Sequence, residues 1–212
     1  MTHVFRETNQ GVTCEHELIE GSPVVSFRTQ RAKIDIVHSQ RFGPMFFIDG
    51  CLQAAHFDEY IYHEFLVHPV KRVCIFGGSD GCAAREVLKW KGVEQVNIVD
   101  WDKELVNYFQ TQGNLWHQGA WRDSRVYHIH QDIVKLAEEQ QVSKFDVIII
   151  DLLDPTFQDL AENGFWETTL RLAKEMLNPG GTVVMNTGGI LPWKTSTFHE
   201  AVRKTYFIFP TA

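Results

Sequence analysis

The stretch that most constrains the fold is residues 73–87, which spell VCIFGGSDGCAAREV. Its first four residues are typical of a short buried strand, the GGSDG run of a tight turn, and the remainder of a helix start. A strand, a glycine turn and a helix in this order form the first βα turn of nucleotide-binding α/β domains. Glycine loops that bind phosphate offer bare backbone N–H groups. Asp80 instead places a carboxylate in the loop, so we expect a nucleoside site that faces a positively charged group.

From residue 71 onward, apolar strands alternate with helices. The predicted strands are 73–76, 95–99, 126–130, 146–150 and 182–186, and the predicted helices are 82–91, 103–112, 133–140, 166–177 and 195–204. Residues 178–181, with sequence NPGG, are expected to end the fourth helix and to turn into the last strand. This alternation predicts an α/β fold with a parallel sheet covered by helices on both faces.

The first 57 residues do not alternate in this way. They are rich in β-branched and aromatic residues, with strands predicted at 24–27, 33–37 and 45–48 between glycine-containing turns. Residues 58–68 then fit a short amphipathic helix, on the pattern of Tyr60, Ile61, Glu64, Phe65 and Val67. We therefore expect a small antiparallel β domain (1–57), a linker helix (58–70) and a Rossmann-like domain (71–212).

Composition narrows the range of partners. The chain has 20 Lys and Arg against 27 Asp and Glu, a formal net charge of -7, and no dense basic run, which disfavours nucleic acid. Its apolar runs are too short to span a bilayer, so no membrane partner is expected. The four cysteines form no C-x-x-C pair and follow no signal peptide, which favours reduced thiols and a cytoplasmic protein.

Acidic residues follow the predicted strands at the sheet edge where open α/β folds bind ligands. They are Asp80, Asp100, Asp132, Asp151 and Asp154. Each alone can be a helix cap or turn residue, but gathered like charges need a cationic or hydrogen-bonding ligand. Asp100 is suited to a ribose diol and Asp132 to an exocyclic amine such as that of adenine. Metal binding is the rival explanation for clustered acids, and we expect no metal site.

Several blocks of the sequence resemble the spermidine synthase family, the polyamine aminopropyltransferases. The blocks are DG at 49–50, DEYIYHE at 58–64, GGSDG at 77–81 with REV at 85–87, VDWD at 99–102, QD at 131–132 and FDVIIIDLLDP at 145–155. The resemblance covers roughly residues 25–205. It implies an N-terminal β domain before a methyltransferase-type Rossmann domain, in a cytoplasmic homodimer of polyamine biosynthesis. It also implies transfer of the aminopropyl group of decarboxylated S-adenosylmethionine, a co-substrate rather than a tightly bound cofactor, to a putrescine-like polyamine.

The resemblance also implies roles for individual residues. The donor-binding residues would be Gly77, Gly78, Asp80, Gly81, Asp100, Asp132 and His63. Asp151 would be the catalytic base, assisted by Tyr62, and Asp154 would bind the acceptor together with Tyr62. From the sequence alone, Tyr62 can also be a packing residue and His63 a core histidine.

The end of the sequence leaves the function open. The sequence ends after residues 206–210, where the family continues with further strands, so we expect the C-terminal strands to be missing. The alternatives are an amine N-methyltransferase that uses S-adenosylmethionine and an inactive nucleoside-binding relative.

Overall fold

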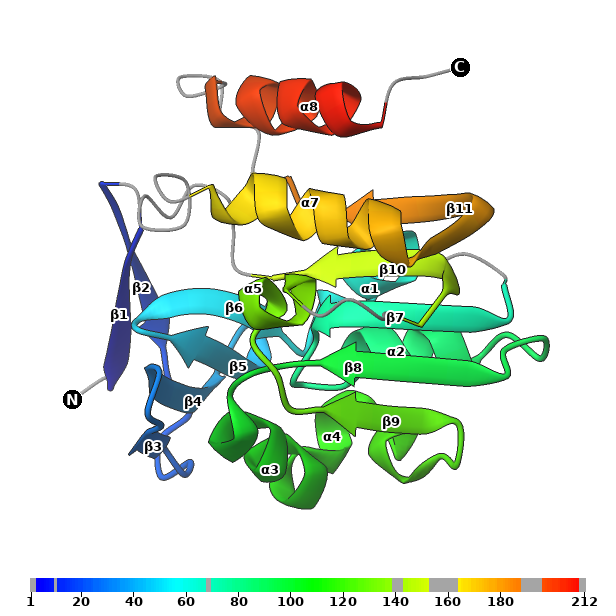
Figure 1. Cartoon of the computed structure of the whole chain (residues 1–212). Coiled ribbons are helices and arrows are strands. Elements are labelled where there is room, and N and C mark those ends of the chain that lie inside the picture. The colour runs from blue at the N-terminus through cyan, green and yellow to red at the C-terminus, as the bar shows by residue number, and fades with distance from the viewer. Residues whose placement is uncertain are drawn as a thin grey trace.

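The computed structural model describes residues 3–9, 11–67, 70–138, 143–152, 164–187 and 196–209. Its centre is a five-stranded parallel sheet in the order β11-β10-β7-β8-β9 (Figure 1). The strands are β7 (Arg72–Gly77), β8 (Gln95–Val99), β9 (Val126–Ile129), β10 (Phe145–Asp151) and β11 (Leu177–Met185). The sheet grows from β7 through β8 to β9, and the chain then returns to the other side of β7. This order is the doubly wound, Rossmann-like arrangement of methyltransferase type, which confirms the predicted fold class.

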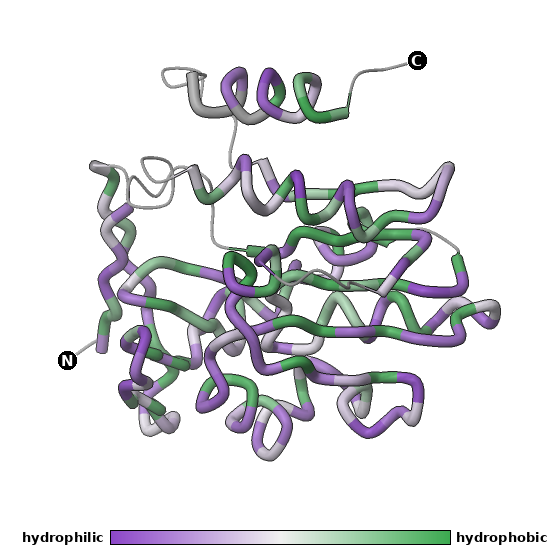
Figure 2. Tube along the Cα trace, viewed as in Figure 1, coloured by the Kyte–Doolittle hydropathy of each residue, from purple (hydrophilic) through white to green (hydrophobic). Residues whose placement is uncertain are grey.

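The two central strands are buried on both faces because successive side chains point to opposite sides of a sheet. One face packs against α5 (Ile133–Ala137) and α7 (Phe165–Met176), and the other against α2 (Cys82–Leu88). The strand side chains on the first face are Cys74, Phe76, Ile148 and Ile150, and those on the second are Val73, Ile75, Val147 and Ile149. The tube in Figure 2 is accordingly hydrophobic along β7 and β10. The continuous apolar runs in the sequence are explained by this two-sided burial.

The remaining helices surround the sheet. They are α3 (Lys103–Gln112), α4 (Asn114–His117), the 3-10 turn η1 (Ala120–Arg122) and α8 (Ser196–Ile208). The helix predicted at 103–112 is confirmed, with Asp102 as its N-cap. α8 lies outside α7, where Lys174 donates a hydrogen bond to the carbonyl oxygen of Ile208 at 2.6 Å (Figure 1). Among the described residues, no helix combines the length and apolar character needed to cross a membrane.

The N-terminal part is antiparallel, as predicted. It contains the hairpin of β1 (Val4–Asn9) and β2 (Val12–Glu17), and a four-stranded sheet of β3 (Val25–Arg28), β4 (Lys33–Ser39), β5 (Gly43–Ile48) and β6 (Cys51–Ala55). β3, β4 and β5 match strands predicted from the sequence, whereas β1, β2 and β6 were not predicted. The four-stranded sheet lies beyond the carboxyl ends of the parallel strands (Figure 1).

The antiparallel sheet shares a core with helices that flank the parallel sheet. Ile34 and Phe46 of the antiparallel sheet pack in one cluster with Leu105, Phe109 and Trp116 from α3 and α4. The antiparallel sheet is thereby fixed over the carboxyl edge of the parallel sheet. The division of the chain at residues 57 and 71 stays a prediction.

The linker helix α1 (Glu59–Phe65) is shorter than predicted and faces differently. Its apolar residues Ile61 and Phe65 are 47% and 82% exposed, whereas Glu59 and His63 are only 6% and 3% exposed. The prediction of a conventional amphipathic helix was therefore wrong about the buried face. Arg85 of α2 lies 2.9 Å from Glu59, so the buried carboxylate on this face is not left without a partner charge.

The predicted turn at residues 178–181 is a bulge within β11. α7 ends at Met176, Leu177 already pairs with Phe145 of β10, and Thr182 pairs with Val147. Four residues of β11 thus face the single residue Asp146 of β10, so the insertion is longer than the one extra residue of a common bulge. The Asn178 side chain donates to the Asp146 carboxylate at 2.8 Å and fixes the bulge.

Candidate active site

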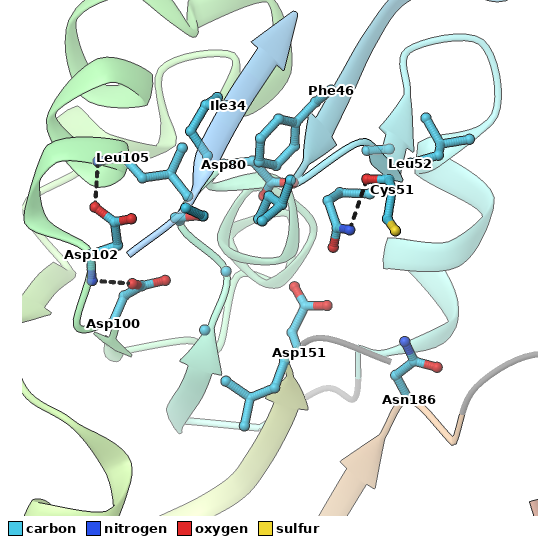
Figure 3. Close-up of a pocket in the computed structure, with 18 of the residues that line it drawn as sticks. Ile34, Phe46, Cys51, Leu52, Asp80, Asp100, Asp102, Leu105, Asp151 and Asn186 are labelled. Carbon is cyan, nitrogen blue, oxygen red and sulfur yellow. Dashed lines mark hydrogen bonds between the residues drawn. The ribbon is translucent and has the colours of Figure 1, made fainter. Parts of the chain in front are cut away.

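A pocket of about 800 Å³ lies at the carboxyl edge of the parallel sheet, beside the point where the strand order reverses between β7 and β10. The glycine loop, Asp100 and Asp151 line it from the parallel sheet. Ile34 and Phe46 line it from the antiparallel sheet (Figure 3). The pocket is therefore acidic on the side of the parallel sheet, and Ile34 and Phe46 are apolar side chains on the side of the antiparallel sheet.

The glycine loop approaches β10 closely. Gly77 has φ +84°, and a Cβ atom built on it would lie 2.1 Å from the carbonyl oxygen of Asp151. Gly81 has φ +76°, and its Cβ would lie 2.7 Å from the ring nitrogen of Trp121. Only glycine meets both demands at these positions. Asp80, within this loop, accepts a hydrogen bond from the Cys82 backbone N–H at 2.9 Å.

Two further acids combine a local backbone role with a place in the pocket. One oxygen of Asp100 accepts from the Asp102 N–H at 2.8 Å, and one oxygen of Asp132 accepts from the Val134 N–H at 2.8 Å as the N-cap of α5. Both residues also line the pocket. The sequence presented cap and ligand residue as alternatives, but the same side chain can be both because a carboxylate has two acceptor oxygens.

Asp151 ends β10 and points toward the space that Asp80 and Asp100 also face (Figure 3). The Tyr62 hydroxyl donates to one Asp151 oxygen at 2.8 Å, and the His63 Nε2 atom lies 4.0 Å from the other. Burial raises the pKa of Asp151, with the charge of Asp80 acting in the same direction, while His63 and Tyr62 oppose the rise. The structure thus brings Asp151, Tyr62 and His63 together in the pocket.

Asp100 is a second acid with a perturbed pKa. Burial raises its pKa to about 7, assisted by the charges of Asp102, Asp80 and Asp151 and opposed by the Asp102 N–H hydrogen bond. The free protein therefore exchanges a proton at Asp100 near neutral pH. A carboxyl group with a pKa close to the working pH is common in ligand sites.

His63 is both a buried histidine and a pocket residue. Its Nδ1 atom lies 2.8 Å from the Glu59 carboxylate and 2.8 Å from the Glu59 carbonyl oxygen. Burial disfavours its charge, but the bond to Glu59 and the nearby Asp80 and Asp151 outweigh burial and raise its pKa to about 9. These contacts favour the imidazolium form of His63 at neutral pH.

Glu59 and Arg85 are site residues that the sequence analysis missed. The Arg85 guanidinium binds both Glu59 oxygens at 2.9 Å, and it donates from Nε to Glu86 at 2.8 Å. Hydrogen bonds from His63 and Arg85 lower the pKa of Glu59 to about 2 against the effect of burial. The four-residue spacing of Glu59 and His63 is a signal that they share one helix face. Their burial depends on Arg85, which is distant in sequence.

Glu59, His63 and Cys82 form a cluster whose potential ligand atoms lie within 4.8 Å of one another. This geometry is compatible with a metal site. However, the Arg85 guanidinium already binds Glu59 and reaches the Cys82 sulfur at 3.8 Å. Burial also raises the pKa of the Cys82 thiol well above its ordinary value. The positive charge at this cluster is therefore the guanidinium of Arg85.

Other pocket residues were not predicted. Asn186 directly follows β11, a position analogous to that of the acids, and this would have been a usable signal (Figure 3). Arg31 stacks on the Trp101 ring with 4.3 Å to its centroid, and both line the pocket. Nothing local in the sequence indicates that pairing. Asp154 lies outside the described residues, so its predicted place in the site is untested.

Comparison with known proteins gives consistent results. The family profile described as "Spermine/spermidine synthase domain" matches residues 55–210. A polyamine aminopropyltransferase of Saccharolobus islandicus is 36% identical over 165 residues, which cover 74% of this chain and 54% of the relative. One of Aeropyrum pernix is 33% identical over 185 residues, covering 84% and 58%. The chain thus spans little more than half the length of these curated relatives.

Solved structures agree with this comparison. A spermidine synthase in complex with the transition-state analogue AdoDATO superposes with a TM-score of 0.86 at 26% identity, covering 99% of this chain and 72% of the other. The spermidine synthase of Thermotoga maritima superposes with a TM-score of 0.83 at 25% identity, covering 99% and 71%. The architecture of this chain is therefore found within larger solved proteins.

Proposed function

Because the chain belongs to the spermine/spermidine synthase domain family, we propose that it transfers the aminopropyl group of decarboxylated S-adenosylmethionine to an amine of a putrescine-like polyamine. The observation that carries the proposal is the convergence of Asp80, Asp100 and Asp151 in one pocket. A donor with a sulfonium and an ammonium, and an acceptor with two amines, are ligands whose charges complement such a site.

The donor half of the pocket suits an adenosine with a cationic tail. Asp100 binds the ribose hydroxyls and Asp132 the adenine amine, each with the oxygen that its backbone contact leaves over. Asp80 binds the ammonium of the aminopropyl group, close to the bare backbone of Gly77, Gly78 and Gly81. A carboxylated donor would bring its own negative charge to Asp80, which favours the decarboxylated one. AdoDATO, bound in the spermidine synthase complex, supports the choice of donor by analogy.

Asp151 is suited to be the base. An alkylamine with a pKa of about 10.4 is protonated at neutral pH and cannot attack. Asp151 takes its proton, and Tyr62 holds the carboxylate in place by its hydrogen bond. The amine lone pair then bonds to the aminopropyl carbon next to sulfur, the carbon–sulfur bond breaks, and its electron pair neutralises the sulfonium to give methylthioadenosine. We assign the binding of the far ammonium of the acceptor to Asp154. We also expect the protein to be a homodimer in the cytoplasm.

The donor assignment is tested by calorimetry with three ligands: decarboxylated S-adenosylmethionine, S-adenosylmethionine and methylthioadenosine. We expect the decarboxylated donor to bind more tightly than the carboxylated one. Asp80→Asn should lower the affinity for the decarboxylated donor by about 10- to 100-fold, which is the contribution of one charged hydrogen bond. Methylthioadenosine lacks the ammonium and should bind Asp80→Asn and the wild type alike, which controls for folding. A preference for S-adenosylmethionine would indicate an N-methyltransferase instead.

The transfer step is tested with a panel of diamines and polyamines. The wild type should consume the decarboxylated donor with at least one amine, and Asp151→Asn should slow transfer by roughly 100-fold or more because the base is lost. Equal, near-zero rates in both proteins would contradict the enzyme proposal and indicate a nucleoside-binding relative.

A further inference from the structure

A chain of buried charges runs behind the pocket. It begins at Arg85 on α2, passes through both oxygens of Glu59, continues to the His63 ring, and ends with His63 Nε2 at 4.0 Å from Asp151. The side chains of Arg85, Glu59 and His63 are 7%, 3% and 4% exposed. Burying this many charges costs free energy unless each is paired, so the arrangement requires an explanation.

Charged and titratable groups surround the His63–Glu59 pair from four parts of the fold. They are Tyr62 on α1, Asp80 in the glycine loop, Cys82 and Arg85 on α2, and Asp151 on β10. Asp80, Asp151, Glu59 and His63 line the pocket, whereas Arg85 binds Glu59 without lining it. His63 is thus the positive charge that separates the pocket acids from the Glu59–Arg85 pair.

We propose that Glu59 and Arg85 are positioning residues that keep His63 a fixed imidazolium beside Asp151, and that this charge keeps Asp151 ionised as a proton acceptor. The inference deepens the proposed function and rests on it for the role of Asp151. Arg85 fixes the Glu59 carboxylate in two-point geometry, and Glu59 fixes the orientation and the proton of the His63 ring. The imidazolium then opposes the two influences that favour a neutral Asp151, which are burial and the charge of Asp80.

The chain offers a matched control. Glu86 is also buried and also binds Arg85, at 2.8 Å from Nε. No contact joins Glu86 to His63 among the described residues. Glu59→Gln and Glu86→Gln therefore remove one carboxylate each from the same guanidinium, but only the first removes the partner of His63. A purely structural role predicts similar effects of the two variants.

The first measurement is an NMR titration of the histidine ring nitrogens in the full chain, with His63 assigned by the loss of its signals in His63→Gln. We expect wild-type His63 to be doubly protonated at about pH 7.5. Glu59→Gln should move its titration midpoint down by at least about one pH unit, a tenfold loss of proton affinity, and Glu86→Gln should move it far less. A wild-type midpoint near the ordinary value of about 6.5 would overturn the inference even if Glu59→Gln does not fold. Equal shifts in the two variants would overturn it as well.

The second measurement is the pH dependence of kcat/KM. In Glu59→Gln the acidic limb should move to higher pH, because Asp151 loses its neighbouring cation, whereas in Glu86→Gln the limb should stay in place. A common loss of rate in both variants with no movement of the limb would contradict the inference. If the wild type transfers to no amine, the proposed function fails, while the NMR titration still decides the charge state of His63.

Discussion

At the scale of single residues, the pocket acids could be found from sequence because each follows a strand. Parallel strands end at one edge, so Asp80, Asp100 and Asp151 had to lie near one another. Their ionisation could not be predicted. It depends on burial beneath the antiparallel sheet and on distances between side chains that are remote in sequence. The sequence also could not show whether Asp100 and Asp132 act as cap or as ligand residues. In the structure one oxygen of each carboxylate accepts from a backbone N–H, and the other is left for a ligand.

The raised pKa of Asp100 predicts a pH-dependent cost to stability. Its pKa of about 7 in the folded protein lies above the ordinary value of 3.8, so the folded state holds the proton more tightly than the unfolded chain. Stability should therefore fall as the pH rises from about 4 to about 7. Asn cannot ionise and can still accept from the Asp102 N–H. We expect Asp100→Asn to be more stable than the wild type by roughly 1–3 kcal/mol at about pH 8, and the gain to vanish near pH 4.

Chemical denaturation across this pH range measures the effect, and Asp123→Asn gives a control of opposite sign. Hydrogen bonds from Arg125 lower the pKa of Asp123 to about 2, so its contribution to stability is present above about pH 4 and lost below it. Asp123→Asn should therefore be less stable than the wild type at pH 8. If Asp100→Asn loses stability at pH 8 as Asp123→Asn does, Asp100 ionises at an ordinary pH and the prediction fails.

At the scale of elements, the spacing of apolar residues was enough to predict most regular strands and helices, and the exceptions have physical causes. α1 buries Glu59 and His63 instead of Ile61 and Phe65 because Arg85 supplies a partner that no periodicity rule contains. The bulge at the start of β11 was mistaken for a turn because Pro and Gly residues serve both, and Gly180 does have a positive φ of +80°.

The close contact between Gly77 of the glycine loop and strand β10 gives a prediction about stability. Gly77→Ala places a methyl group 2.1 Å from the Asp151 carbonyl oxygen at a φ that disfavours Ala. We expect it to cost roughly 2–4 kcal/mol of unfolding free energy and to abolish donor binding. Gly92→Ala meets no atom within 4 Å and has no positive φ, and should change stability by about 0.5 kcal/mol or less. Urea denaturation of both variants checks this, and similar values for the two would contradict the assigned close approach.

At the scale of the whole molecule, we expect the antiparallel sheet and the Rossmann-like part to unfold as one cooperative unit, because the antiparallel sheet shares a hydrophobic cluster with α3 and α4. Phe46 contacts Phe109 edge to face with ring centroids 5.0 Å apart, and it is 3% exposed. The sequence indicated two regions of different period but not their packing, because β4 and β5 show which side chains are apolar and not what covers them.

Truncating this contact should destabilise both parts together. We expect Phe46→Ala to cost about 3–5 kcal/mol, whereas Phe65→Ala on the exposed face of α1 should stay within about 0.5 kcal/mol. All six tryptophans lie beyond residue 71, and Trp116 packs in the same cluster as Phe46, so their fluorescence reports unfolding of the parallel part together with this cluster. A Phe46→Ala variant whose tryptophan transition does not move would mean that the two sheets unfold independently.

The contact between Gly77 and β10 also has a consequence for how such a sequence can vary. The atom that excludes a side chain at position 77 belongs to the backbone of residue 151, and every amino acid has a carbonyl oxygen there. No exchange at position 151 can therefore compensate for a change at position 77. No single substitution elsewhere can therefore make room for a side chain at position 77. A larger residue would fit only if β10 moved away as a whole, and this movement would also displace Asp151.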